Sequence, residues 1–216
     1  MKNSSTKNEW KQAKADIFWG EIAPCDHVLQ IYENDGVFLD ALSGFVGGAI
    51  NANEACIVIA TDNHLKALEI RLENYGVHID TLVSEERYIP LNAEETLSSF
   101  MINGWPDEKL FTQTISGIIK KARGETKRGI RAFGEMVALL WAQGNNGATV
   151  QLEHLWNEFC SREAFCLFCA YPKIGFTEDI ADSINHICCA HSKMIAGSEN
   201  QLTEIFYKET TYKEAI

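Results

Sequence analysis

The sequence has little positive charge and no long hydrophobic run. Its 216 residues include 19 lysines and arginines against 30 aspartates and glutamates, which gives a formal net charge of −11. Nucleic acid and anionic membrane surfaces attract clustered basic residues, so neither is expected as the main partner. No segment approaches the roughly 18 consecutive apolar residues of a membrane span, and the polar N-terminus lacks the apolar core of a signal peptide. These absences predict a soluble cytoplasmic protein.

Several motifs that carry chemistry are also missing. Residues 32–44 (YENDGVFLDALSG) stand where a phosphate loop, GxxxxGK[ST], would follow the first strand, but they contain no lysine and no Ser/Thr at the required place. No serine nucleophile elbow is present. The seven cysteines are an odd number and several lie within apolar patterns, which favours a reducing compartment over a disulfide framework. Nucleotide hydrolysis and serine hydrolase chemistry are therefore disfavoured.

The sequence does contain a regular alternation of apolar strands and amphipathic helices, and apolar residues make up 46% of it. Apolar runs predict strands at residues 27–32, 55–60, 88–91, 129–133 and 165–170. Helical stripes follow these strands, and Ser198 with Gln201 is predicted to open a last short helix. Because strands that alternate with helices form right-handed crossovers, we expect a three-layer α/β fold with a mainly parallel sheet. One domain would span residues 18–216, after an N-terminal tail or loose helix at residues 1–17.

Polar and aromatic residues follow the carboxyl ends of these predicted strands. Tyr32, His64, Glu135 and Tyr171 would face one crevice if the strands are parallel, because ligands collect at that edge of a sheet. Aromatic side chains with a few polar groups are typical of a small-molecule pocket. Glu135 at its strand-to-helix junction would act as a general base, a metal ligand or an acceptor for a ligand group. The alternatives are that Glu135 caps the following helix and that the tyrosines only pack in the core.

The cysteines raise the question of a metal. Cys166 and Cys169 have CxxC spacing, but residues three apart on a strand point to opposite faces, so both are predicted to be buried core thiols. Cys188 and His191 share one face of a helix and would supply two ligands, with Cys169 or His27 as others. No CxxC…HxxxH spacing supports such a site. No metal and no other cofactor is therefore predicted, and Cys169, Cys188 and His191 stay weak candidates.

Several long segments resemble the MEDS domain, the sensory domain named for methanogen and methylotroph sensors and the dichloromethane regulator. They are EACIVIATDNH (residues 54–64), AFGEMVALLW (132–141), LEHLWN (152–157) and CAYP (169–172). The resemblance extends from about Phe18 to Ala196. It implies a RecA-like core without a phosphate loop and a sensory role in binding hydrocarbon derivatives. It also places His27, His64 and Glu135 at motif positions, without assigning their tasks.

The sequence thus predicts a stand-alone sensory module that is not an enzyme. Its small-molecule ligand would bind at the strand carboxyl ends, with His27, Tyr32, His64, Glu135 and Tyr171 as candidate contacts. The signal would pass to a separate protein through an exposed helix, and a homodimer is compatible with the composition. One alternative is an enzyme or degenerate nucleotide-binding protein that uses Glu135 and His64. A second alternative is a signalling scaffold that binds no ligand.

Overall fold

A computed structural model describes residues 11–13, 19, 22–125, 128–175, 181–197 and 204–207. Its strands are β1 (Lys11–Ala13), β2 (His27–Tyr32), β3 (Ala55–Ala60), β4 (Tyr88–Asn92), β5 (Met101–Ile102), β6 (Trp105–Pro106), β7 (Ile130–Gly134), β8 (Cys166–Pro172), β9 (Lys193–Gly197) and β10 (Glu204–Tyr207). Its helices are α1 (Asp35–Asn51), α2 (Asp62–Asn74), α3 (Ile79–Ser84), α4 (Ala93–Ser98), α5 (Glu108–Arg123), α6 (Met136–Ala142), α7 (Asn146–Glu163), α8 (Ala181–Ala190) and the 3-10 turn η2 (Lys173–Gly175).

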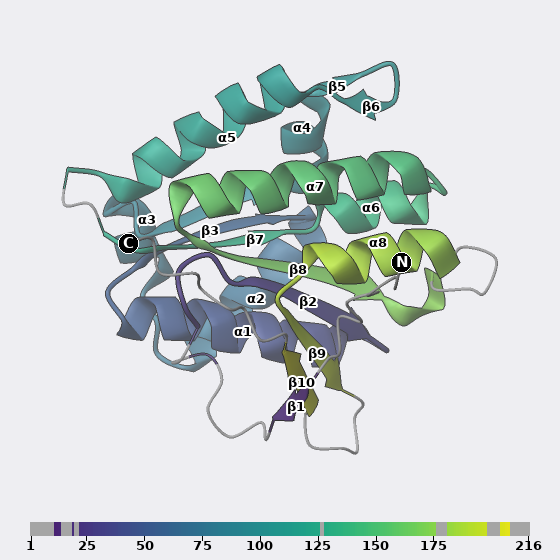
Figure 1. Cartoon of the computed structure of the whole chain (residues 1–216). Coiled ribbons are helices and arrows are strands. Elements are labelled where there is room, and N and C mark those ends of the chain that lie inside the picture. Colours follow the sequence, from purple (N-terminus) through teal and green to yellow (C-terminus); the bar gives the residue numbers. More distant parts are fainter. Residues whose placement is uncertain are drawn as a thin grey trace, which may run out of the picture.

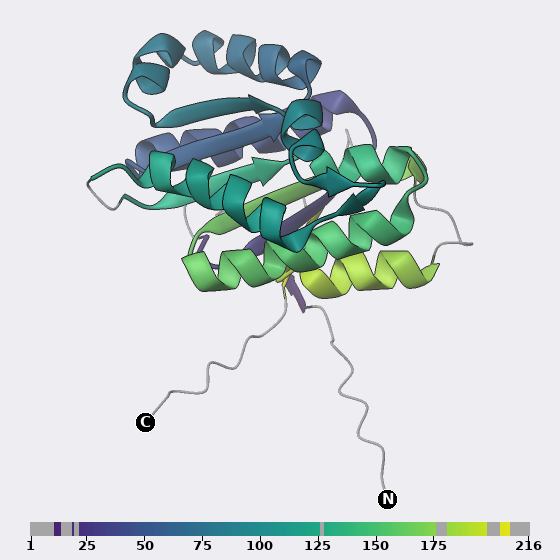
Figure 2. The same cartoon turned by 90° about the horizontal axis from the view of Figure 1, so that it is seen from above.

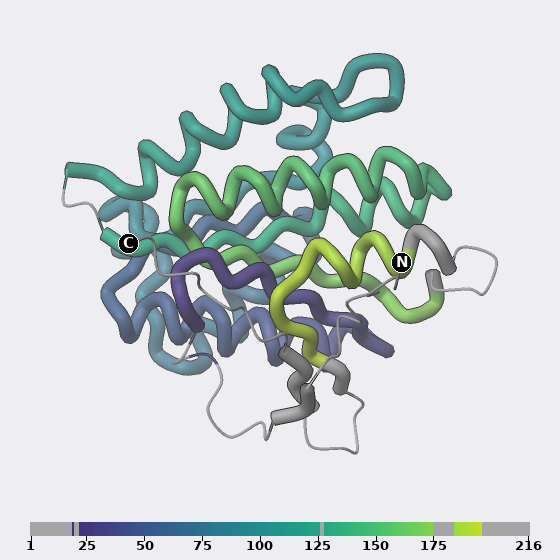
Figure 3. The backbone as a smooth tube through the Cα atoms, in the orientation of Figure 1, coloured from purple at the N-terminus to yellow at the C-terminus, as the bar shows by residue number. Residues whose placement is uncertain are grey.

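The main sheet has the strand order β1-β10-β9-β2-β8-β7-β3-β4. All pairings from β9 through β4 are parallel, whereas β10 and β1 add to the β9 edge in antiparallel fashion. In Figure 3 the chain runs from the green α7 through β8 to the yellow α8, and β9 then pairs with the purple β2. The carboxyl ends of the parallel strands therefore meet at one edge of the sheet, as the strand–helix alternation predicts.

Helices cover both faces of this sheet. In Figure 1, α5, α6, α7 and α8 lie over one face, and α1 and α2 lie under the other. Figure 2 shows α7 and α8 side by side, in agreement with their packing contacts. Side chains alternate along each strand, so Ile57 and Ile59 of β3 enter the first core while Cys56 and Val58 enter the second. This double coverage explains why β3 is buried along its whole length.

The three-layer α/β fold with a mainly parallel sheet is confirmed, and each of the predicted strands is present. One local prediction at the chain ends is wrong: Lys11–Ala13, predicted as tail or loose helix, forms β1. The last short helix, predicted to open at Ser198 and Gln201, lies outside the described residues, and β10 comes after these positions. β1 and β10 have three and four residues, too few to give a clear apolar periodicity.

The amino end of the sheet is closed by a tight contact between α1 and Trp19. A Cβ on Gly48 would lie 2.8 Å from Arg131 Nη1 and 3.0 Å from the Trp19 carbonyl oxygen, whereas a Cβ on Gly47 would meet nothing within 4 Å. Arg131 is buried and donates through Nε to Glu54 at 2.6 Å. This end of the domain is therefore filled by packing and an ion pair. Among the described helices, none has the length and apolar character needed to cross a bilayer.

Candidate functional site

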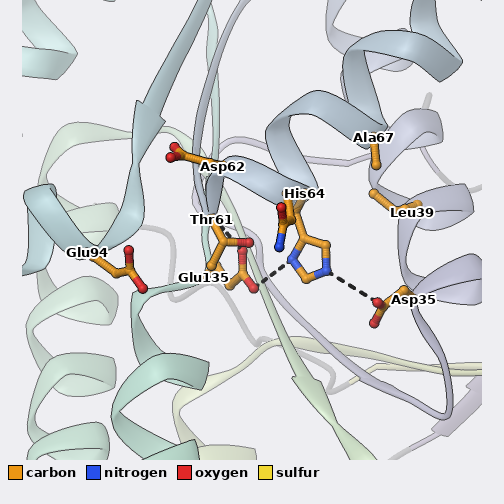
Figure 4. Close-up of a pocket in the computed structure, with 9 residues that line it drawn as sticks. Asp35, Leu39, Thr61, Asp62, His64, Ala67, Glu94 and Glu135 are labelled. Carbon is orange, nitrogen blue, oxygen red and sulfur yellow. Dashed lines mark hydrogen bonds and ion pairs between the residues drawn. The ribbon is translucent and has the colours of Figure 1, made fainter.

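Glu135 lies at the carboxyl end of the sheet, between β7 and α6. Its backbone N–H donates to the carbonyl of Ile59 at 2.8 Å, which fixes the junction against β3. The carboxylate does not cap α6. Instead, Oε2 accepts a hydrogen bond from the Thr61 N–H at 2.8 Å, and Oε1 accepts one from Nδ1 of His64 at 2.7 Å (Figure 4). Glu135 therefore occupies the N-cap position of α6, as in the capping alternative, but its carboxylate binds the β3–α2 turn and not the amides of α6.

His64 links this carboxylate to the start of α1. Its Nε2 atom lies 3.7 Å from Oδ2 of Asp35, so the imidazole stands between two acidic groups (Figure 4). The hydrogen bond to Glu135 is the main cause that raises the pKa of His64 above its ordinary value of 6.5. Burial opposes this effect, and the negative charges of Glu135 and Asp35 add to it. The protonated imidazolium is thus favoured in the folded protein.

A pocket of about 530 Å³ opens beside this pair. Carboxylates, small polar groups and two apolar side chains line it: Asp35, Leu39, Thr61, Asp62, Asn63, His64, Ala67, Glu94 and Glu135. His64 is the one basic residue in this lining. The volume lies in the range of small-molecule sites. Its acidic lining repels phosphate and attracts cations and hydrogen-bond donors.

The start of α1, where a phosphate loop would hold its anion, is already occupied by protein groups. Asn34 caps the helix, and its side-chain oxygen accepts from the Val37 N–H at 3.1 Å. Asp35 adds a negative charge in the first turn. Amides at a helix start bind phosphate when they are free and the surroundings are not acidic. Neither condition holds here, in agreement with the missing lysine and Ser/Thr.

Tyr32 lies at the carboxyl end of β2, next to the pocket lining but not within it. Its ring stacks on Phe38 with a centroid distance of 4.9 Å, and Phe38 contacts His64 edge to face at the same distance. Burial, followed by the charges of Glu135 and Asp35, raises the pKa of the Tyr32 hydroxyl. Tyr32 is therefore connected to His64 through the ring of Phe38, which packs against both side chains.

The sequence model of the family described as "MEthanogen/methylotroph, DcmR Sensory domain" matches residues 26–192. This stretch includes every strand of the parallel sheet except β9. The chain belongs to the MEDS family. No curated protein matches the chain.

Solved structures support the RecA-like fold that the family implies. The chain is similar to the KaiC-like protein PH0186 from Pyrococcus horikoshii OT3, with a TM-score of 0.59, 10% identity and coverage of 95% of this chain and 91% of the other. It is also similar to PH0250 from the same organism, with a TM-score of 0.56, 10% identity and 94% coverage of each chain. At this identity the likeness concerns the fold alone. The MEDS domain thus has a RecA-like core without the phosphate loop.

The structure separates His27 and Tyr171 from the MEDS strand-end pocket, contrary to the predicted common crevice. His27 begins β2 and so lies at the amino end of the sheet. Tyr171 is near the carboxyl end of β8, but its side chain belongs to the core on the α7 face and its hydroxyl donates to Oε1 of Glu153. For Tyr171 the cause is the two-residue period of a strand, which directs its side chain to the α7 face.

His27, Glu153, Cys169 and His191 form a second, buried group in the MEDS domain, with potential ligand atoms all within 4.8 Å of one another. Cys169 and His191 were two of the three weak metal candidates; Cys188 is not in the group. Burial raises the pKa of Glu153 to about 8, against hydrogen bonds from Tyr171 and Cys169. Burial, and next the neighbouring His191, lowers the pKa of His27 well below 6.5.

Sequence reasoning did not select Glu153, although a signal for it exists. Glu153 lies on the buried face of α7 together with Thr149, Trp156 and Cys160, at the four-, three- and four-residue steps of one helical stripe. A carboxylate in such an apolar stripe needs a partner, because an isolated buried charge is very unfavourable. The opposite placement of Cys166 and Cys169, one in each core, is as predicted.

Proposed function

We propose that this MEDS domain senses a small molecule bound in the strand-end pocket and passes the signal to a separate protein. A sensory role follows from the family. The observation that carries the finer proposal is Glu135, a carboxylate that is 6% exposed, lines the pocket and holds α2 through Thr61 and His64. A ligand that competes for this carboxylate would act directly on the positions of two helices.

The charge of the pocket supports a ligand with hydrogen-bond donors or a positive charge. Asp35, Asp62, Glu94 and Glu135 face the space, and Leu39 and Ala67 offer a small apolar wall (Figure 4). A short-chain amine or alcohol would place its polar group against the carboxylates and its carbon chain against that wall. A carboxylic acid or a nucleotide would bring negative charge to an acidic surface. The proposed ligand class is therefore a small amine or alcohol.

The hydrogen bonds of Glu135 suggest how binding is transmitted. His64 lies in the first turn of α2 and contacts Asp35, which lies in the first turn of α1. A ligand that takes over the carboxylate would release His64 and alter the spacing between these two packed helices. Ile70 and Tyr75, which are 50% and 79% exposed on and just after α2, are side chains that a partner protein would contact.

Thermal unfolding in the presence of candidate ligands tests this proposal. Small amines and alcohols should raise the melting temperature of the wild-type chain. At a ligand concentration of 100 times Kd, the free energy of unfolding should increase by about 2.7 kcal/mol. Glu135→Gln should weaken the binding of that ligand by at least about tenfold, because a charge-assisted hydrogen bond is lost. Glu73→Gln, an exposed change on α2, is the matched control and should leave affinity unchanged. Equal binding by Glu135→Gln, or stabilisation by ATP or carboxylic acids instead, would contradict the proposal.

The second candidate function is an enzyme. The specific observation in its favour is the 2.7 Å hydrogen bond by which Glu135 orients His64, since a carboxylate-oriented imidazole is a common general base. Turnover of any of the screened compounds, lost in both Glu135→Gln and His64→Gln, would favour this reading. Binding without turnover in the wild type would favour the sensor.

A further inference from the structure

Four side chains with metal-binding chemistry meet beneath α7 and α8, away from the strand-end pocket. They come from four separate segments: His27 from the start of β2, Glu153 from α7, Cys169 from β8, and His191 from the link between α8 and β9. Their exposures are 1%, 1%, 0% and 2%. Figure 1 shows β2, β8, α7 and α8 converging in this region. Buried polar side chains of this kind are unfavourable unless their charges and lone pairs have partners.

The hydrogen bonds of both histidines turn their second ring nitrogen toward the group. Nδ1 of His27 lies 3.0 Å from the carbonyl of Ala190, and Nδ1 of His191 lies 2.6 Å from the carbonyl of Ile187. A carbonyl only accepts, so in each ring Nδ1 carries the hydrogen and Nε2 of the neutral imidazole carries a lone pair. Metal-ligating histidines are held in this way, by an outer hydrogen bond that fixes the tautomer.

Glu153 directs a further lone pair to the same point. Tyr171 donates to Oε1, while Oε2 accepts no hydrogen bond from the described residues. Oε2 faces Nε2 of His27 at 3.4 Å and Nε2 of His191 at 3.6 Å. In its ionised form the Glu153 carboxylate faces two nitrogen lone pairs out of water, which is unfavourable unless a proton or a cation lies between them. A positive ion at the centre would attract Oε2 of Glu153 and the Nε2 atoms of His27 and His191.

Three of the six separations among these ligand atoms match one four-coordinate ion, and all six are within 4.8 Å. With zinc–nitrogen and zinc–oxygen bonds of about 2.0–2.1 Å and a zinc–sulfur bond of about 2.3 Å, tetrahedral geometry puts N and O ligands about 3.3 Å apart and N and S ligands about 3.5 Å apart. The corresponding contacts are 3.4 and 3.6 Å for nitrogen to oxygen, and 3.4 Å between His27 Nε2 and Cys169 Sγ. The side chains therefore stand close to ligand positions.

We propose that His27, Glu153, Cys169 and His191 bind one Zn²⁺-class transition ion as a structural site. Imidazole, thiolate and carboxylate together match the ligand preferences of zinc. Four protein ligands leave no open coordination position for chemistry. The ion fastens α7 and the α8–β9 link to strands β2 and β8, and the thiol proton of Cys169 and the carboxyl proton of Glu153 are released to solvent when the ion binds. This site and the strand-end pocket are separate and make separate predictions.

Metal analysis of the full chain, purified without a histidine tag, tests the site. We expect about one zinc ion per chain, retained through dialysis because the ligands are buried. After exchange for Co²⁺, the spectrum should show a thiolate-to-cobalt charge-transfer band and the visible bands of a four-coordinate ion. Cys169→Ala should remove the charge-transfer band. Cys166→Ala is the matched control, since it changes a buried thiol of the same strand on the opposite face, and it should retain the band.

X-ray absorption at the zinc edge of the wild-type chain covers the case in which Cys169→Ala does not fold. The spectrum should contain one sulfur at about 2.3 Å and nitrogen or oxygen at about 2.0–2.1 Å. A chain that contains no metal and takes up no Co²⁺ would overturn the proposal, and the group would then be a proton-sharing hydrogen-bond cluster. Bound zinc without a sulfur neighbour would also overturn it. Glu135→Gln should keep the ion, so failure of the pocket proposal does not affect this result.

Discussion

Replacing Glu135 by glutamine should loosen the strand-end edge of the sheet without changing its shape. The carboxylate accepts from two donors at once, the Thr61 N–H and His64 Nδ1. Glutamine has one acceptor oxygen, so it can serve only one of them, and its amide hydrogens face the other donor. Glu135 is 6% exposed, so water in the adjoining pocket restores the lost bond only in part.

The size of this effect follows from the interactions lost. A hydrogen bond to a charged group contributes about 1.5–3 kcal/mol, and a buried donor left without an acceptor costs about 1–3 kcal/mol. These two values describe overlapping losses, so we expect a decrease of about 2–3 kcal/mol in the free energy of unfolding. For a domain of this size, each kcal/mol lowers the melting temperature by about 2–4 °C. The variant should therefore melt roughly 4–12 °C below the wild type.

Urea denaturation of Glu135→Gln and the wild type, followed by tryptophan fluorescence, measures this difference. Glu73→Gln, which removes an exposed carboxylate on the adjacent helix, should change the free energy of unfolding by no more than about 0.5 kcal/mol. If Glu135→Gln were as mild as this control, Glu135 would not hold α2 as described, and the structural basis of the proposed switch would be refuted.

Two further predictions concern pH and packing. Because the folded-state pKa of His64 is raised above 6.5, its protonation stabilises the fold fully below pH 6.5, and this contribution is lost as pH rises through the folded pKa. Urea denaturation at a series of pH values from about 6 to 9 should show that the free energy of unfolding declines with pH in the wild type and declines less in His64→Gln. Parallel pH dependences of the two proteins would contradict this prediction. In α1, Gly48→Ala should destabilise by about 1–3 kcal/mol through overlap with Arg131 and the Trp19 carbonyl. Gly47→Ala, which meets nothing, should stabilise by about 0.5–1 kcal/mol through helix propensity, and equal effects at both glycines would refute this packing.

Local sequence patterns were sufficient for the central sheet. The run ACIVIA is buried along its whole length because helices cover both faces of β3, and that coverage is what a continuous apolar strand indicates. Glu135 and His64 could also be selected, since each follows a strand that ends at the same edge of a parallel sheet. For these residues, position along the chain determines position in space.

The remaining parts depend on contacts that no local pattern contains. Tyr171 is predicted to follow a strand end as Glu135 does, yet it lies within β8 and its side chain points to the other face. His27 and His191 are 164 positions apart and meet because β9 pairs with β2. Glu153 joins them from a helix that sequence periodicity describes as apolar. A cluster built from four distant segments becomes visible only in three dimensions.

Two-dimensional NMR of the labelled chain, titrated with short-chain amines and alcohols, tests the proposed sensory pocket at the strand carboxyl ends. We expect one of these ligands to shift the backbone amide signals of Asp35, Thr61, His64 and Glu135 in the wild type, and to cause much smaller shifts at these positions in Glu135→Gln at the same concentration. Ligand-induced shifts that lie elsewhere on the domain, or that are equally large in Glu135→Gln, would contradict it.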